Sequence, residues 1–262
     1  MPSEKMISRK ENGIGWMILN NPERHNAISL EMWSAAREIM ADFNADPAVR
    51  VMVLTGAGGK AFASGADISK FKDERQQAGA VAHYQETTQK SYEALMNMRV
   101  PTIAMIRGYC IGGGTAVAVC CDLRICTENA KFGIPAAKLG LGYGLNRARP
   151  LVDLVGPAFA KEMFFTGRQF DAREAEKMGL VNRVVPDDKL EAVVQELAQT
   201  IAENAPLTVS CAKLVVSEAL KDPDERDVAA CERAVDACFK SSDYKEGQAA
   251  FMEKRKPRFI GA

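Results

Sequence analysis

Residues 107–116 constrain the fold more than any other part of the sequence. An apolar run at 102–106 is typical of a buried strand, and three consecutive glycines, Gly112 to Gly114, separate it from an apolar helical stretch at 115–120. A strand that turns on glycines into a helix leaves free backbone N–H groups at the helix N-terminus, where a phosphate, a carboxylate or an oxyanion can bind. Alternatively, the glycines only allow a helix and a strand to pack closely. The stretch by itself leaves both interpretations open.

Apolar runs of strand length and helix length alternate along the chain up to about residue 185. Strands are predicted at 14–19, 51–54 and 181–185, and residues 51–54 are apolar on both faces, as expected of a buried parallel strand. Ser29 is predicted to cap a helix that ends at Asp46-Pro47, and another helix is expected at 80–98. Beyond residue 185 the pattern is helical. The alternation indicates an α/β core of repeated strand–strand–helix units at residues 1–195, followed by a helical region at 196–262. This helical region either serves for oligomerisation or simply covers the core.

Composition excludes several classes of protein. With 262 residues, of which 47% are hydrophobic and 26% charged, the chain can build the core of an ordinary globular domain. Lys plus Arg and Asp plus Glu both total 34, and a net charge of zero argues against nucleic acid or an anionic membrane as the main partner. No apolar run approaches the length of a membrane span, and residues 1–5 lack a signal-peptide core. We therefore expect a cytoplasmic protein with no membrane partner.

The cysteines and histidines give no sign of a metal site. Seven cysteines is an odd number, none forms a C-x-x-C pair, and only two histidines are present. We expect no zinc site and predict reduced, mostly buried thiols, with Cys120, Cys121 and Cys126 in apolar runs.

Several motifs in a fixed order resemble the crotonase (enoyl-CoA hydratase/isomerase) superfamily over nearly the whole chain. They include Asn-Pro-Glu-Arg-His-Asn-Ala at 21–27, Ser-Gly-Ala-Asp-Ile at 64–68 and Gly-Tyr-Cys-Ile-Gly-Gly-Gly at 108–114. Further matches lie at 121–122, 132–135, 165–167, 175–181 and 251–256. The resemblance implies a spiral core of stacked strand–strand–helix units, with C-terminal helices that build a homotrimer or a dimer of trimers. It also implies an acyl-CoA thioester as substrate and no cofactor beyond its coenzyme A moiety.

The resemblance assigns site residues by position. The backbone N–H groups of Ala66 and Gly113 match the pair that hydrogen-bonds the thioester carbonyl as it becomes an enolate. This agrees with the independent interpretation of both loops as sources of N–H groups. The remaining positions match the coenzyme A-binding segments: Arg24, His25, Ala27, Ala66, Asp67, Ile68 and Lys254. Lys254 is alternatively a solvated charge.

The chain departs from the family at its catalytic carboxylates. Hydratases of the family carry two glutamates, and alanines, Ala116 and Ala136, stand at the matching positions. Addition of water needs one group to activate the water and one to protonate the α-carbon, and alanine can do neither. Single-glutamate isomerases keep the second position, and dehalogenase-like members carry an aspartate where Gly144 stands. An efficient hydratase is therefore not expected.

Tyr143 is the remaining candidate for titratable chemistry. It matches an active-site tyrosine of the methylmalonyl-CoA decarboxylase branch, although that branch has a histidine at the position of Ala66. Loss of carbon dioxide generates an enolate directly and needs no carboxylate base. Alternatively, Tyr143 only packs against the acyl pocket.

Three other side chains are weaker candidates. His83, next to Tyr84 on the helix expected to line the pocket, is either an acid–base group or a surface residue. Arg147 and Arg149 either bind a substrate carboxylate or form surface or intersubunit ion pairs.

Three functions remain open. The first is an acyl-CoA enzyme that uses the Ala66/Gly113 donors, with a decarboxylase-like lyase using Tyr143 as one form of it. The second is a catalytically weak protein that binds coenzyme A esters. The third, an RNA-binding member of the family, is disfavoured by the zero net charge.

Overall fold

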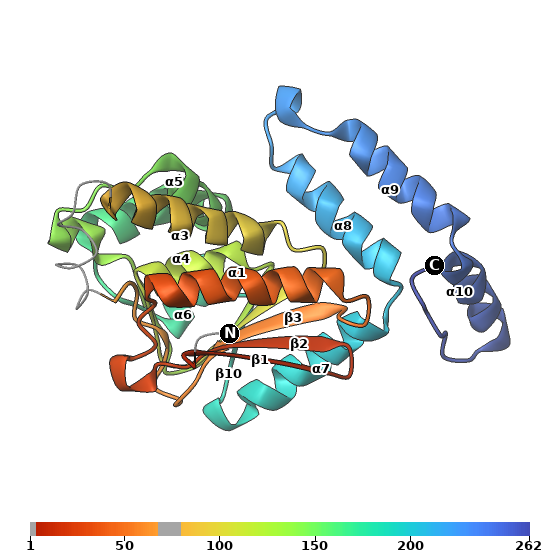
Figure 1. Cartoon of the computed structure of the whole chain (residues 1–262), viewed down its shortest axis with the longest axis horizontal. Coiled ribbons are helices and arrows are strands. Elements are labelled where there is room, and N and C mark those ends of the chain that lie inside the picture. Colours follow the sequence, from red (N-terminus) through yellow and green to blue (C-terminus); the bar gives the residue numbers. More distant parts are fainter. Residues whose placement is uncertain (1–3, 68–79) are drawn as a thin grey trace.

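The computed structural model describes residues 4–67 and 80–262, in which the strands form two sheets (Figure 1). Neighbouring strands are parallel, except that β1 pairs with β2 and β8 with β9 in antiparallel fashion. The larger sheet has the order β1 (Met6–Glu11), β2 (Ile14–Leu19), β3 (Val51–Gly56), β5 (Thr102–Ile106), β7 (Leu123–Thr127) and β10 (Arg183–Val185). The smaller sheet has the order β4 (Ala61–Ala63), β6 (Tyr109–Ile111), β8 (Lys131–Gly133) and β9 (Phe170–Asp171).

Three successive stretches of chain each give one strand to each sheet and then continue into a helix. The first is β3 and β4 followed by α3 (Ala80–Met96), and the second is β5 and β6 followed by α4 (Gly113–Cys120). The third is β7 and β8 followed, after a short 3-10 turn, by α5 (Leu145–Thr166). The repeated strand–strand–helix unit predicted from the alternation of apolar runs is therefore confirmed.

The larger sheet is covered on both faces. On β3, Met52 and Leu54 belong to the core that α1 (Leu30–Ala45), α3 and α4 share with the sheet. Val51 and Val53 point to the other face and pack with buried residues of α7 (Leu190–Glu203). Successive side chains of a strand face opposite sides, so a strand between two helical layers must be apolar at every position.

Local capping signals in the sequence correctly located several helix ends. The Ser29 hydroxyl accepts a hydrogen bond from the Met32 N–H, and α1 ends before Asp46. Asp171 forms a capping box with Glu174 at the start of α6 (Ala172–Lys177). The last strand begins later than predicted, at Arg183, because the Val181 N–H is donated to the Ala175 carbonyl instead of to the sheet.

The cysteines predicted to be buried are buried. Cys120, Cys121 and Cys126 lie in the core, as does Cys110. Gly156 has a positive φ of 73° and divides α5 into two helical segments. Residues 70–79, a polar stretch typical of a loop, lie outside the described residues.

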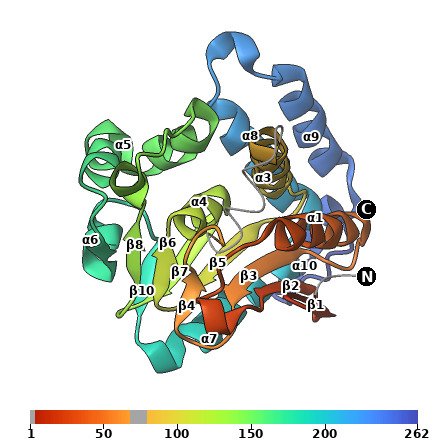
Figure 2. The ribbon, with the colours of Figure 1, turned by 60° about the vertical axis from the view of Figure 1, so that its left-hand side comes forward.

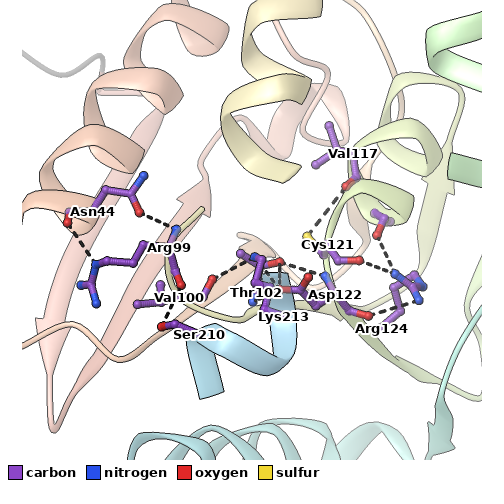
Figure 3. A network of polar contacts seen from close by, with 11 residues as sticks. Asn44, Arg99, Val100, Thr102, Val117, Cys121, Asp122, Arg124, Ser210 and Lys213 are labelled. Atoms are coloured by element: carbon purple, nitrogen blue, oxygen red, sulfur yellow. Dashed lines mark hydrogen bonds and ion pairs between the residues drawn. The ribbon is translucent and has the colours of Figure 1, made fainter. Parts of the chain in front are cut away.

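Polar contacts fix the C-terminal end of α4. The buried Arg124 guanidinium donates hydrogen bonds to the carbonyls of Ala118, Cys121 and Leu180. The last carbonyls of a helix have no partner within it and carry partial negative charge, so a cation that binds them is favourable. Asp122 accepts hydrogen bonds from the Thr102 N–H and hydroxyl and, at 2.8 Å, from Lys213 Nζ (Figure 3). Asp122 therefore anchors the turn after α4.

Three helices extend from the body of the molecule at its C-terminal end (Figure 1). They are α8 (Pro206–Ala219), α9 (Val228–Lys240) and α10 (Ser242–Glu253). Lys213, on α8, ties them to the core, while Val216, Phe239 and Phe251 leave large apolar side chains exposed. Residue 195, where the predicted core ends, lies within α7, which packs on the sheet. The first of the extended helices begins later, at Pro206. The division of the chain into two regions stays a prediction. None of the described helices is long and apolar enough to cross a membrane.

Removal of the Arg124 guanidinium is expected to destabilise the fold. Arg124→Gln leaves buried carbonyls at the end of α4 without a donor, and we expect it to lower the free energy of unfolding by about 3 kcal/mol. Arg183→Gln, at an exposed arginine of the neighbouring strand β10, should change it by less than about 0.5 kcal/mol. Urea unfolding of both variants measures the difference, and equal losses would contradict the structural role of Arg124.

Candidate functional site

A cavity of about 610 Å³ lies beside the N-terminus of α4. Its walls come from the loop after β4, the 3-10 turn η3 (Pro135–Leu139), α3 and the first turn of α5. Figure 2 shows α4 between α3 and α5. Most of the described lining is apolar or aromatic, with a few polar groups, which is the usual character of a small-molecule site.

Two backbone N–H groups without a described acceptor meet in this cavity, at Ala66 and Gly113. Ile28 pairs with Ala66 in a parallel bridge through the Gly65 carbonyl and the Asp67 N–H, so the N–H of Ala66 itself faces away from Ile28. Gly113 is the first residue of α4, where the N–H has no partner within the helix. A Cβ added to Gly113 would lie 3.5 Å from the Ala66 nitrogen. The structure therefore brings together the two donors predicted from the sequence.

The three glycines before and within α4 have different functions. Gly112 adopts φ 56° and ψ −115°, a conformation that side-chain-bearing residues avoid. A Cβ on Gly114 would lie 2.1 Å from the Ala63 carbonyl oxygen, so this glycine allows close packing of α4 against β4. A Cβ on Gly113 would make only ordinary contacts, the shortest at 3.4 Å. The packing interpretation of the glycine run therefore holds for Gly114, while the role of Gly113 as an N–H donor stays a prediction.

The segment before α1 forms one side of the entrance. Arg24 and Ala27 line the cavity, and Arg24 Nη1 lies 3.2 Å from a carboxylate oxygen of the buried Asp67. His25 and Asn26 both have positive φ values, 51° and 55°. The buried Asn26 amide holds this turn by donating hydrogen bonds to the carbonyls of Ala57 and Ala61.

Three predicted binding residues do not join the described cavity lining. His25 is exposed beside the entrance, with its ring edge toward Tyr109. Ile68 lies outside the described residues. Lys254 caps the C-terminal end of α10, which Figure 1 places on the opposite side of the molecule from α5. Within one chain, the structure does not bring Lys254 to the cavity.

The two alanines that stand at the expected glutamate positions are placed differently. Ala136 lines the cavity, whereas Ala116 is buried in the first turns of α4 and is absent from the described lining. Among the described lining residues, Asp67 is the only carboxylate, and Arg24 already pairs with it. The described cavity therefore offers no free carboxylate as an acid or base.

Tyrosines supply neutral hydroxyl groups to the lining. Tyr143 packs against Phe164, with ring centroids 4.8 Å apart, and burial raises its pKa to about 12, an effect that the nearby Arg147 partly opposes. Burial also raises the pKa of Tyr92 well above its usual value. Both side chains remain protonated at neutral pH, so they can donate a proton or a hydrogen bond but are poor bases.

The structure separates the basic candidates. Arg147 lines the cavity, and its Nη2 lies 2.7 Å from Thr88 Oγ1. Arg149 instead donates to the Leu220 carbonyl, 2.8 Å away, and His83 is exposed. The surface interpretation therefore fits His83 and Arg149 but not Arg147.

Sequence analysis missed three residues of α3 that line the cavity, Gln85, Thr88 and Tyr92. Thr88 and Tyr92 follow Tyr84 at intervals of four, so all three lie on one face of the helix. A helical stripe of hydroxyl-bearing residues was the signal that could have identified Thr88 and Tyr92. No group of three or more metal-ligating side chains is found in residues 4–67 and 80–262.

Comparisons with known proteins agree over nearly the whole chain. The model of the enoyl-CoA hydratase/isomerase family matches residues 9–262. The crotonyl-CoA hydratase of Syntrophomonas wolfei is 35% identical over 264 residues, which cover 99% of either chain. The (E)-benzylidenesuccinyl-CoA hydratase of Thauera aromatica is 36% identical, over 96% of this chain and 97% of that one. The crystal structure of an enoyl-CoA hydratase/carnithine racemase from Magnetospirillum magneticum matches with a TM-score of 0.92 and 37% identity, covering 99% of this chain and 96% of that one. The predicted spiral of strand–strand–helix units is thereby confirmed.

Tyr143 should make the protein more sensitive to alkali. Its folded pKa of about 12 exceeds the unfolded value of about 10, so its contribution to stability is complete below pH 10 and is lost as the pH rises toward 12. Between pH 9 and 11, Tyr143→Phe should lose about 1 kcal/mol less stability than the wild type in urea unfolding. Tyr244→Phe, at an exposed tyrosine, is the control. Parallel losses in all three proteins would contradict the assigned pKa.

Proposed function

The chain belongs to the enoyl-CoA hydratase/isomerase family, and we propose that it is an enzyme that stabilises the enolate of an acyl-CoA thioester. One observation carries the proposal: the unpaired N–H groups of Ala66 and Gly113 lie side by side in an apolar cavity. Two such donors stabilise an oxygen as it gains negative charge, and loss of one costs about 10²–10³ in rate. Arg24 and Ala27, at the entrance, are positioned to bind the coenzyme A moiety.

The proposed reaction is not an efficient hydration. Hydration requires an acid and a base beside the double bond. Ala136 supplies neither at the cavity wall, and Ala116 supplies neither on α4. Asp67, a carboxylate in the described lining, is occupied by Arg24. A reaction that forms the enolate without a carboxylate base fits these residues best.

Decarboxylation in the manner of methylmalonyl-CoA decarboxylase is the second candidate, and Tyr143 supports it. Carbon dioxide leaves with cleavage of a carbon–carbon bond, whose electron pair becomes the enolate held by Ala66 and Gly113. The neutral Tyr143 hydroxyl in the cavity can then hydrogen-bond or protonate the product. A protein that binds coenzyme A esters without turnover is the remaining alternative.

We further propose that the functional form is a homotrimer or a dimer of trimers. Val216, Phe239 and Phe251 expose apolar surface on α8, α9 and α10, more than a solitary chain usually leaves in water. Lys254, which lies away from the cavity of its own chain, would reach a cavity only from a second copy. Sedimentation of the purified protein tests the assembly.

A panel of thioesters tests the reaction. We expect negligible hydration of crotonyl-CoA, because no free acid–base pair is available, and mass spectrometry of the mixture detects addition of water as a gain of one water mass. Methylmalonyl-CoA in the same panel reports loss of carbon dioxide, with Tyr143→Phe as the matched variant. Rapid hydration of crotonyl-CoA would refute the conclusion drawn from Ala116 and Ala136. Binding of the panel without any turnover would favour the non-catalytic alternative.

Two neighbouring glycines test the donor pair. Gly113→Ala places a methyl group 3.5 Å from the Ala66 nitrogen, so we expect turnover to fall by about 10² or more while the free energy of unfolding changes by less than about 1 kcal/mol. Gly114→Ala forces a methyl group against the Ala63 carbonyl and should destabilise the protein by roughly 2–3 kcal/mol. Turnover assays and urea unfolding separate these effects. Full activity of a folded Gly113→Ala variant would argue against the proposed site.

A further inference from the structure

Arg147 lies where the cavity meets a second hollow. It lines the main cavity and also this adjoining hollow of about 550 Å³, and Gln85 and Gly142 are likewise shared between the two. Glu86 is the acidic residue in the described lining of the second hollow, and its carboxylate pairs with Lys90 Nζ at 2.6 Å and not with Arg147. The Ala66 and Gly113 donors line only the main cavity. If the carbonyl of a ligand binds those donors, Arg147 lies where the rest of the ligand would pass from the main cavity into the second hollow.

The contacts of the guanidinium leave most of its donors unused. Nη2 donates to Thr88 Oγ1 at 2.7 Å, and Cζ lies 5.8 Å from the centroid of the Tyr92 ring. The buried Thr88 hydroxyl in turn donates to the carbonyls of its own helix, so its oxygen is fixed as an acceptor for Arg147. Across the described ranges, the Arg147 side chain forms no ion pair and no second hydrogen bond. Guanidinium carries five N–H donors in a planar fork that fits a carboxylate.

The position of Arg147 in the fold raises the free-energy cost of a guanidinium charge that no anion compensates. Arg147 is in the first turn of α5, where the helix dipole disfavours a cation, and that turn contains no acidic residue. Its side chain is partly removed from water, which raises the cost of an uncompensated charge. Arg149, two residues later, has the Leu220 carbonyl and Asp153 as neighbours. Of these two arginines, only Arg147 lacks an ion pair with a described acidic residue.

We propose that Arg147 binds a carboxylate at the far end of the acyl group, and that the substrate is the coenzyme A monothioester of a dicarboxylic acid. This inference rests on the proposed function, because it assumes that a thioester occupies the cavity. An ion pair with Arg147 stabilises the carboxylate before the reaction. If the reaction had to remove that carboxylate as carbon dioxide, the ion pair would slow the reaction. The carboxylate on Arg147 is therefore retained during the reaction and fixes the acyl group in the site.

Matched pairs of thioesters test the proposal by calorimetric binding. Succinyl-, glutaryl- and adipyl-CoA are compared with butyryl-, pentanoyl- and hexanoyl-CoA, which have the same chain lengths but end in a methyl group. At least one dicarboxylic member should bind the wild type about 10- to 100-fold more tightly than its partner, as for a hydrogen-bonded charge pair. Arg147→Gln should reduce that ratio to about 1, Arg147→Lys should keep part of it, and the control Arg149→Gln should keep all of it. Thermal unfolding confirms that each variant is folded.

The outcomes distinguish failure of the proposed function from failure of the proposed dicarboxylic substrate. If no thioester of either series binds, the proposed function fails. If both series bind equally well to the wild type, the proposed function stands and the dicarboxylic substrate is refuted. A preference that survives in Arg147→Gln but is lost in Arg149→Gln would refute the assignment to Arg147. Methylmalonyl-CoA is measured in the same way. If it alone binds more tightly than the methyl-ended thioesters, the carboxylate lies next to the thioester, and the proposal of a retained carboxylate at the far end is refuted.

Discussion

The whole site depends on a contact between two stretches of main chain with no side chain between them. The first residues of α4 lie directly against the loop after β4, and a single methyl group on Gly114 would collide with the Ala63 carbonyl. The far end of α4 is held by Arg124, which binds its last carbonyls, and by Asp122 in the turn that follows. Because both ends of this short helix are fixed, the position of the Gly113 N–H is set by the core and does not depend on a flexible loop.

Features governed by local chemistry could be predicted from the sequence. Ser29 and Asp171 cap helices because a side-chain oxygen meets nearby N–H groups, and the two apolar faces of β3 follow from its period of two. The pairing of Ala66 with Gly113 was expected from the resemblance to the family, and the glycine turns that open helices agreed with it. The difference between Arg147 and Arg149 could not be predicted, because it depends on how α5 is rotated against α3. The distance of Lys254 from the cavity of its own chain could not be predicted either, since it depends on how the C-terminal helices pack.

The composition of the cavity favours enolate chemistry over acid–base chemistry. Its described lining combines apolar surface with tyrosine hydroxyls, and burial keeps those of Tyr143 and Tyr92 protonated. In such an environment an N–H donor stabilises negative charge more strongly than it would in water, because few competing dipoles are present. The features that make the cavity a poor place for a free carboxylate base thus strengthen the Ala66/Gly113 pair. Arg147 adds one positive charge to the lining, among the residues that the cavity shares with the second hollow.

The use of backbone donors has a consequence for how such a protein can evolve. Every amino acid except proline carries the N–H that Ala66 contributes, so almost any codon change at that position preserves the donor itself. The glycines that allow the loops to approach one another tolerate far less change. The proposed donor pair therefore depends on positions that lack side chains, while Ala136, Tyr143 and Arg147 belong to the wall of the cavity. Under the proposed function, a change at one of these wall residues would alter the fate of an enolate without removing the donors.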